Sequence, residues 1–160
     1  MNQLHLKLQE CFPDAVISVH AERGDETAII KRENLLEVAR FLKDNSDFNM
    51  NVLMDLTAVD GLWMEASPRF EVVYHFYSVV KNHRLRIKVP VAESDLSVSS
   101  LTDLWPIANW FEREVWDMFG IKFEGHPNLK RILMYEEFVG HPLRKDYPID
   151  KRQPLIGPKN

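Results

Sequence analysis

Two histidines, His126 and His141, each stand in a Gly-His-Pro tripeptide, fifteen residues apart. Imidazole nitrogens bind metal ions, and nearby carboxylates could complete a ligand shell. Catalytic zinc needs three protein ligands and an open position, and these histidines lack the short paired spacing of zinc signatures. The alternative is structural, because glycine permits a sharp turn, histidine forms hydrogen bonds and proline extends the following chain. The carboxylates that could complete such a ligand shell are Glu124, Glu136 and Glu137. On the ligand count we expect no metal site here.

A second candidate for chemistry is the charged stretch around Glu114 and Asp117, where paired carboxylates could act as acid and base. No nucleophile or oxyanion donor stands beside them, and the chain has no phosphate loop, Gly-x-Gly-x-x-Gly or Gly-x-Ser-x-Gly motif. Arg113 and Asp117 are four residues apart and could pair on one helix face. We expect these charges to be structural and predict no catalytic residue.

Cys11 is the only cysteine. A single cysteine excludes an internal disulfide, and it excludes an iron–sulfur cluster or cysteine-built zinc site held by this chain alone. No apolar run approaches the length of a membrane span, and the first twelve residues mix polar with apolar types, unlike a signal peptide. The sequence predicts a soluble, cytoplasmic chain with no cofactor of its own.

The net charge of −4 hides an uneven distribution. Residues 141–160 hold five Lys and Arg against two Asp, which is +3, so residues 1–140 carry −7. The cations of the tail are interrupted by prolines and alternate with apolar residues. This mixture favours a strap on a protein surface over a nucleic-acid-binding patch.

The elements that would position these residues can be predicted from periodicity. The 160 residues, 45% of them hydrophobic, suit a single core. Alternation in 69–80 places Phe70, Val72, Tyr74 and Phe76 on one face and His75 on the other. The fold class expected is α+β, with a mixed, largely antiparallel sheet, helices packed on it and an extended C-terminal tail. The expected helices are 2–12, 33–43 and 106–119, and the expected strands are 15–20, 27–30, 51–59, 69–80 and 84–91.

The segment after Gly120 has no convincing periodicity. Residues 97–103 are expected to form a loop with a short helical turn. In the helix that follows, Ile107, Trp110, Phe111, Val115 and Met118 form the predicted buried stripe. Some forty residues without regular structure are long for a loop in a compact domain. We therefore predict a compact α+β domain over 1–120 and an extended, partner-ordered segment over 121–160.

Taken together, the last helix and the stretch after it form a long motif. It resembles the signature of the 30 kDa subunit of respiratory complex I, and its densest part covers about forty residues. The earlier elements agree with that family in order and only loosely in sequence. The spaced residues are Glu112-Arg113-Glu114, Asp117, Met118-Phe119, His126, Lys130 and Ile132-Leu133.

The resemblance implies a non-catalytic subunit in the peripheral arm of proton-pumping NADH:quinone oxidoreductase. It implies docking on the hydrogenase-like subunit that helps to form the quinone pocket, and contacts with neighbouring iron–sulfur subunits. FMN and the iron–sulfur clusters would then belong to partner subunits, with none in this chain. Membrane association would be indirect, on the cytoplasmic side of the bacterial inner membrane.

Docking residues follow from the motif and the tail, because charged and amphipathic side chains suit interfaces. Two alternatives stay open. The chain could serve a ferredoxin-linked or hydrogenase-type relative of the complex, or it could be a stand-alone metal-dependent or acid–base enzyme. The residues predicted at the partner interface are Arg113, Asp117, His126, Arg131, Tyr135, His141, Arg144, Lys145 and Tyr147.

Overall fold

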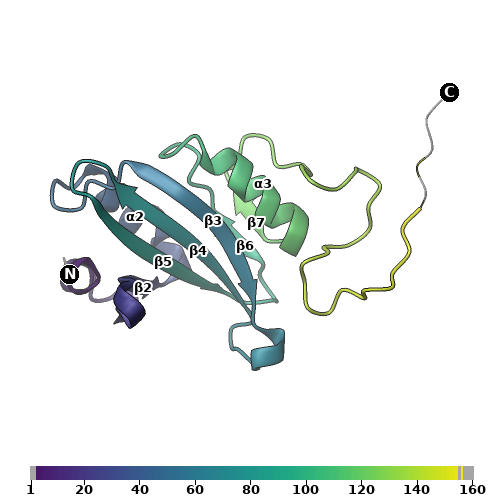
Figure 1. The fold of residues 1–160 in the computed structure, drawn as a ribbon, viewed down its shortest axis with the longest axis horizontal. Helices are drawn as coiled ribbons and strands as arrows, with labels where there is room; N and C mark the ends of the chain where they lie inside the picture. The colour runs from purple at the N-terminus through teal and green to yellow at the C-terminus, as the bar shows by residue number, and fades with distance from the viewer. Residues whose placement is uncertain (1–2, 155, 157–160) are drawn as a thin grey trace.

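A five-stranded sheet forms the centre of the computed structural model, which describes residues 3–154 and 156 (Figure 1). Its strand order is β1-β2-β5-β4-β3, in which only the β2–β5 pair is parallel. The predicted α+β class with a mixed, largely antiparallel sheet is confirmed. The strands are β1 (Val16–His20), β2 (Thr27–Ile30), β3 (Val52–Asp60), β4 (Phe70–Ser78), β5 (His83–Val91), β6 (Ser97–Ser99) and β7 (Lys122–Glu124).

Three helices pack on the sheet: α1 (Leu4–Cys11), α2 (Leu35–Asp44) and α3 (Ala108–Phe119). Figure 1 shows α2 behind the strands and α3 alongside β3. The core lies between the helices and one face of the sheet, and the predicted inward residues of β4 are all buried there. On the opposite face lie His75 and Arg86, partly exposed. Alternation therefore predicted both faces of β4 correctly.

A second, two-stranded parallel sheet joins β6 to β7, and the sequence did not predict it. Residues 97–99 were expected to be a loop, and no regular element was expected after Gly120, so both expectations are corrected. Each strand has only three residues. A run this short shows no usable alternation, and its identity depends on a partner strand more than twenty residues away.

The buried face of α3 also differs from the prediction. Val115 and Met118 are buried, but Trp110 and Ile107 are exposed. Glu112 is fully buried instead. The periodicity was helical as expected, but polar side chains occupy part of the inward stripe. On α1, Cys11 is exposed, whereas Leu4 and Leu8 are buried.

The chain beyond β7 has no regular secondary structure in its described part. We call residues 125–154 the tail. In Figure 1 the tail leaves the small sheet, passes α3 and extends away from the main sheet. Glycines with positive φ, Gly125 at +83° and Gly140 at +106°, turn its path at the start of each Gly-His-Pro tripeptide. The final residues of the predicted segment 121–160 lie outside the described residues.

Candidate functional site

The tail is fixed to α3 by Asp117, a fully buried carboxylate. Its Oδ2 accepts hydrogen bonds from the backbone N–H groups of Ile132, Leu133 and Met134, at 3.1, 2.9 and 2.8 Å. Its Oδ1 accepts one from Arg131 Nη1 at 2.5 Å. Burial raises the pKa of Asp117, but these hydrogen bonds outweigh it and hold the pKa below its usual range. The carboxylate is thus ionised and dictates the path of residues 131–134.

The second Gly-His-Pro stretch caps the C-terminal end of α3. The last helical carbonyls have no partner within a helix and need donors from elsewhere. The carbonyl of Asp117 accepts His141 Nδ1–H at 3.0 Å, and that of Met118 accepts the N–H of Leu143 at 3.1 Å. The carbonyl of Phe119 accepts Arg144 Nε–H at 2.6 Å. All three carbonyls beyond Trp116 are therefore satisfied by the tail.

Gly120 makes this close approach possible. Its φ of +81° is a left-handed conformation that glycine adopts freely. A Cβ at this position would lie 2.7 Å from the His141 ring and 2.9 Å from the guanidinium of Arg144. Burial lowers the pKa of His141, and the neighbouring guanidinium groups of Arg144 and Arg131 lower it further. His141 is accordingly a neutral capping group.

The first Gly-His-Pro stretch binds the other end of α3. His126 Nε2–H donates to the carbonyl of Asn109 at 3.1 Å, and its Nδ1 accepts the N–H of Asn128 at 3.0 Å. Both ring nitrogens of this histidine are therefore engaged within the chain. Arg113 donates from Nε and Nη2 to the carbonyls of Lys130 and Arg131, each at 3.1 Å. The expected Arg113–Asp117 ion pair does not form, because each side chain binds the tail instead.

A third attachment connects the tail to the sheet through Asp60, at the end of β3. Arg69 Nε and Nη2 donate to its two oxygens at 2.9 and 2.8 Å, and the N–H of Lys145 donates to Oδ2 at 2.8 Å. The hydrogen bonds from Arg69 lower the pKa of Asp60 to about 2. Arg69 also pairs with Asp146 of the tail at 3.0 Å. Sequence reasoning missed this pair, because Asp60 and Arg69 lie far from the motif.

The outer part of the tail is held together by its own side chains. Phe138 lies between Tyr135 and Tyr147, with ring centroids 5.7 and 6.0 Å away. Gln153 bonds the N–H and the carbonyl of Val139 at 3.1 and 3.0 Å and donates to Tyr147 Oη at 2.6 Å. The tail is therefore folded on itself although it lacks helices and strands.

Glu112 joins α3 to the end of β6 inside the core. Its carboxyl oxygens accept Ser100 Oγ–H at 2.6 Å and the N–H of Leu101 at 2.7 Å. Burial raises its pKa to about 7, and the two hydrogen bonds offset only part of that shift. The buried hydroxyl of Tyr74 has no partner among the described residues.

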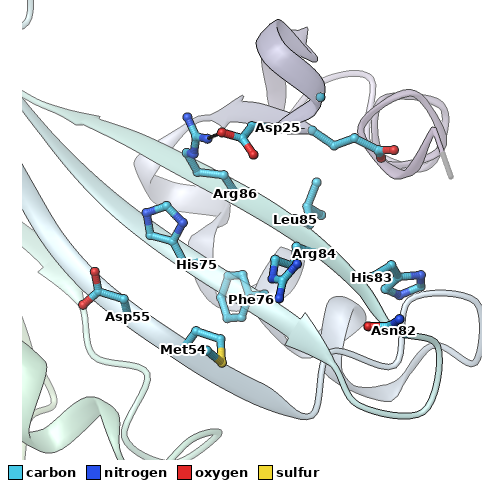
Figure 2. A pocket seen from close by; sticks show the side chains of 12 residues that line it. Asp25, Met54, Asp55, His75, Phe76, Asn82, His83, Arg84, Leu85 and Arg86 are labelled. Carbon is cyan, nitrogen blue, oxygen red and sulfur yellow. Dashed lines mark ion pairs between the residues drawn. The ribbon is translucent and has the colours of Figure 1, made fainter. Parts of the chain in front are cut away.

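A separate cleft of about 630 Å³ opens on the sheet around His75 and Arg86, and Gly24 of the short 3-10 helix Glu22–Gly24 contributes to its lining (Figure 2). Asp55, His75 and Arg86 come from three adjacent strands and lie in one cross-strand row. Arg86 pairs with Asp25 at 2.7 Å. Burial lowers the pKa of His75, and Arg86 lowers it further. The lining residues include no serine, threonine or cysteine, so the cleft offers no hydroxyl or thiol nucleophile.

The predicted interface residues divide into two groups in the structure. Asp117 is fully buried, and internal hydrogen bonds engage the side chains of Arg113, His126, Arg131, His141 and Arg144. Tyr135 and Lys145 are exposed, and Tyr147 is half-buried in the aromatic cluster. The hydrogen-bonding role expected for both histidines is confirmed. Within residues 3–154 and 156, no group of three His, Cys, Asp or Glu is arranged to hold a metal ion, and no helix could span a membrane.

Solved structures share the fold of this chain. The structure matches a trypsin-resistant fragment of Nqo5 with a TM-score of 0.68 and 33% identity, covering 81% of this chain and 100% of the fragment. It also matches a chain of an archaeal membrane-bound sulfane sulfur reductase with a TM-score of 0.71, covering 92% and 85% of the two chains. At 23% identity, the second match concerns the fold alone.

Sequence comparison identifies the family. Residues 28–153 match the model of the respiratory-chain NADH dehydrogenase 30 kDa subunit. The chain is 49% identical to the corresponding NADH-quinone oxidoreductase subunit of Citrifermentans bemidjiense, over 98% of its own length and 96% of the relative. For the corresponding subunit of Roseiflexus castenholzii the identity is 50%, over 89% and 81%. The chain therefore belongs to the 30 kDa subunit family of complex I, the NADH-quinone oxidoreductase. Its partners are other subunits of that complex.

Proposed function

We propose that this chain is a non-catalytic assembly subunit of the peripheral arm of complex I, which docks on the hydrogenase-like subunit near the quinone site. FMN and the iron–sulfur clusters that carry electrons from NADH to quinone belong, in this proposal, to partner subunits. A chain with one cysteine cannot supply the four ligands of a cluster. The subunit is held on the cytoplasmic side of the inner membrane by protein contacts alone.

One observation carries the docking proposal: the tail keeps a fixed path while large apolar side chains point outward from it. Leu133, Val139 and Leu143 are each half or more exposed. Their backbones are held by Asp117, Gln153 and the end of α3. Ordered apolar groups left in water are typical of a surface that another protein covers. At the start of α3, Ile107 and Trp110 are also exposed.

The test is retention by the complex. We expect the triple variant Leu133→Ser, Val139→Ser, Leu143→Ser to bind a complex lacking its own 30 kDa subunit about tenfold more weakly, because several interface anchors are truncated at once. The matched control is Val79→Ser, Val80→Ser at the β4–β5 turn, where two equally exposed valines lie far along the sheet. Equal retention of both variants, with the hydrogenase-like subunit present in the recovered complex, contradicts the proposal.

The stand-alone enzyme is the weaker alternative. It requires His126 and His141 as ligands, yet both nitrogens of His126 already form hydrogen bonds within the chain.

The electron donor is NADH for the named relatives, which disfavours a ferredoxin-linked assembly. Affinity purification from native cells, followed by assays with NADH and with reduced ferredoxin, distinguishes the two kinds of complex.

A further inference from the structure

The turn between β3 and β4 presents three consecutive large apolar residues, Leu62, Trp63 and Met64, on a short 3-10 helix. Trp63 is 76% exposed and Met64 is 69% exposed. In Figure 1 this turn protrudes beyond the ends of both strands, at the bottom of the view. Single exposed apolar residues are ordinary, but a protruding run that includes tryptophan marks a contact surface.

The turn is rigid. The N–H of Leu62 donates to Asp60 Oδ1 at 3.0 Å, and the N–H of Gly61 donates to the carbonyl of Arg69 at 2.8 Å. The carbonyl of Gly61 in turn accepts the N–H groups of Met64 and Ala66, at 3.0 and 3.1 Å. A side chain presented on a rigid turn loses little conformational entropy when it is bound. Trp63 is therefore preorganised as an anchor.

The same carboxylate connects this turn to the tail. Asp60 accepts the N–H of Leu62 through one oxygen and the N–H of Lys145 through the other. Lys145 Nζ lies 5.1 Å from the centre of the Trp63 ring, a cation–π distance. The nearby carboxylates of Asp60, Glu93 and Asp146 pair with Arg69 and not with Lys145. The exposed Leu143 lies two residues before Lys145.

We propose that Trp63 and Met64 insert into an apolar pocket of the partner subunit on which the tail docks, and that Lys145 meets a carboxylate at the rim of that pocket. This inference rests on the proposed function and adds a second anchor, from the sheet, to the docking surface. Tryptophan in a desolvated pocket is among the commonest energetic anchors of interfaces. Lys145 supplies charge complementarity, which favours a partner of opposite sign.

Two other occupants fit the charges less well. Exposed carboxylates of Glu65, Glu93 and Asp146 surround the turn, and they would be repelled by an anionic lipid surface. In a symmetric pair of copies the same patch faces itself, so the exposed carboxylates of Glu65, Glu93 and Asp146 would approach those of the second copy. A protein pocket with a single carboxylate placed opposite Lys145 avoids both conflicts.

The experiment compares Trp63→Ser, Met64→Ser with the control Val79→Ser, Val80→Ser in binding to a complex depleted of its own 30 kDa subunit. We expect the first double variant to bind at least tenfold more weakly and the control to stay within about twofold of the natural chain. Unchanged thermal unfolding of both variants establishes that the fold is intact, as expected for side chains that point into water. Equal binding by both variants would overturn the inference.

Other outcomes separate the two proposals. If the natural chain is not retained at all, the proposed function fails. If the tail variant loses binding while Trp63→Ser, Met64→Ser binds normally, only this inference fails. Self-association of the isolated chain that disappears in the Trp63 variant would identify a second copy as the occupant. Co-sedimentation with phosphatidylglycerol–phosphatidylethanolamine vesicles that depends on Trp63 would identify a membrane as the occupant. Self-association or vesicle binding of this kind would overturn the proposal that Trp63 and Met64 insert into a pocket of the partner subunit.

Oxidation of Met64 gives a readout that needs no substitution. The thioether is 69% exposed in the isolated chain and is open to hydrogen peroxide. We expect Met64 to oxidise readily in the free chain and at least tenfold more slowly in the assembled complex, as measured by peptide mass spectrometry. Equal oxidation rates in the two states would place the turn in water and overturn the inference.

Discussion

At the scale of single residues, buried carboxylates organise this molecule in two different ways. Asp117 and Asp60 are surrounded by donors, so their pKa values fall and their charges hold the tail. Glu112 has two donors and no cation, so burial dominates and raises its pKa to about 7. The first two stabilise the fold in their ionised form, whereas ionisation of Glu112 is unfavourable.

Glu112 predicts a pH dependence of stability. Its folded-state pKa, about 7, lies above its ordinary value of 4.5, so the folded chain binds more protons than the unfolded chain between these values. Its contribution is fully present below pH 4.5 and is lost as the pH rises through 7. We expect Glu112→Gln, which cannot ionise, to remove this decline and to be roughly 3 kcal/mol more stable than the natural chain at pH 8.

Urea unfolding of both chains from pH 5 to pH 8 measures the effect. Glutamine can still accept the N–H of Leu101 and can donate to the hydroxyl oxygen of Ser100, so it retains both contacts. Glu114→Gln is the matched control, because Glu114 lies two residues along the same helix and is exposed. Parallel stability curves for the natural chain and Glu112→Gln would contradict the assignment.

Two adjacent residues of the tail, Arg144 and Lys145, have different roles, which sequence patterns do not distinguish. Arg144 and Lys145 were both predicted as charged contacts for a partner. Arg144 caps α3, whereas the side chain of Lys145 is exposed over Trp63. Charge reversal at Arg144 would therefore disturb folding together with docking, and Lys145→Glu is the cleaner probe of the interface.

At the scale of elements, the end of α3 depends on Gly120. We expect Gly120→Ala to lower the free energy of unfolding by about 2 kcal/mol or more, because alanine disfavours a left-handed φ and its Cβ would displace the His141 ring and Arg144. Gly125→Ala is the control, since its φ is also positive but no atom lies within 4 Å of the point that its Cβ would occupy.

Chemical denaturation of the two variants separates backbone strain from lost capping. Gly125→Ala should cost only the conformational term, about 1 kcal/mol. If the two substitutions cost the same, the close packing of the tail against Gly120 contributes nothing to stability, and the capping role assigned to residues 141–144 is wrong.

The helices and strands differ in how well the sequence predicts their buried faces. Alternation predicted the buried face of β4, because that face of the large sheet packs on the apolar core. It failed for α3, where Glu112 and Asp117 are buried by donors from irregular segments. No periodic pattern encodes such donors. Of the candidate site, the resemblance indicated the stretch 112–133, but the contributions of Asp60, Arg69 and Gln153 depend on tertiary contacts alone.

At the scale of the whole molecule, the hydrogen bonds and ion pairs that attach the tail to α3 and to the sheet end at Asp146, and Gln153 bonds other residues of the tail. Lys151 and Arg152 are exposed and lie beyond the Asp60 and Asp117 attachments, whereas Arg131 is largely buried. Proteases cut where local opening costs little free energy. We expect limited trypsin digestion of the isolated chain to cut first after Lys151 or Arg152.

Mass spectrometry of the products over time tests this order. Cleavage after Arg131 or Arg144 should be at least tenfold slower, because it requires release of the contacts on α3. The variant Asp117→Asn supplies the comparison, since loss of the buried charge should expose the Arg131 site. Early cleavage at Arg131 in the natural chain would contradict the description of a fixed tail.

The caps on α3 have a consequence for how the chain is made. The carbonyls of residues 117–119 need donors at 141–144, which the ribosome adds only after the whole sheet and the helix itself. N-terminal parts of a protein generally fold first during synthesis, and contacts between distant residues form late. A chain that stops before Arg144 leaves carbonyls at the C-terminal end of α3 without donors. The exposed apolar residues of the tail then have no fixed position. The tail is therefore shaped for assembly only after residues 141–144 have been synthesised.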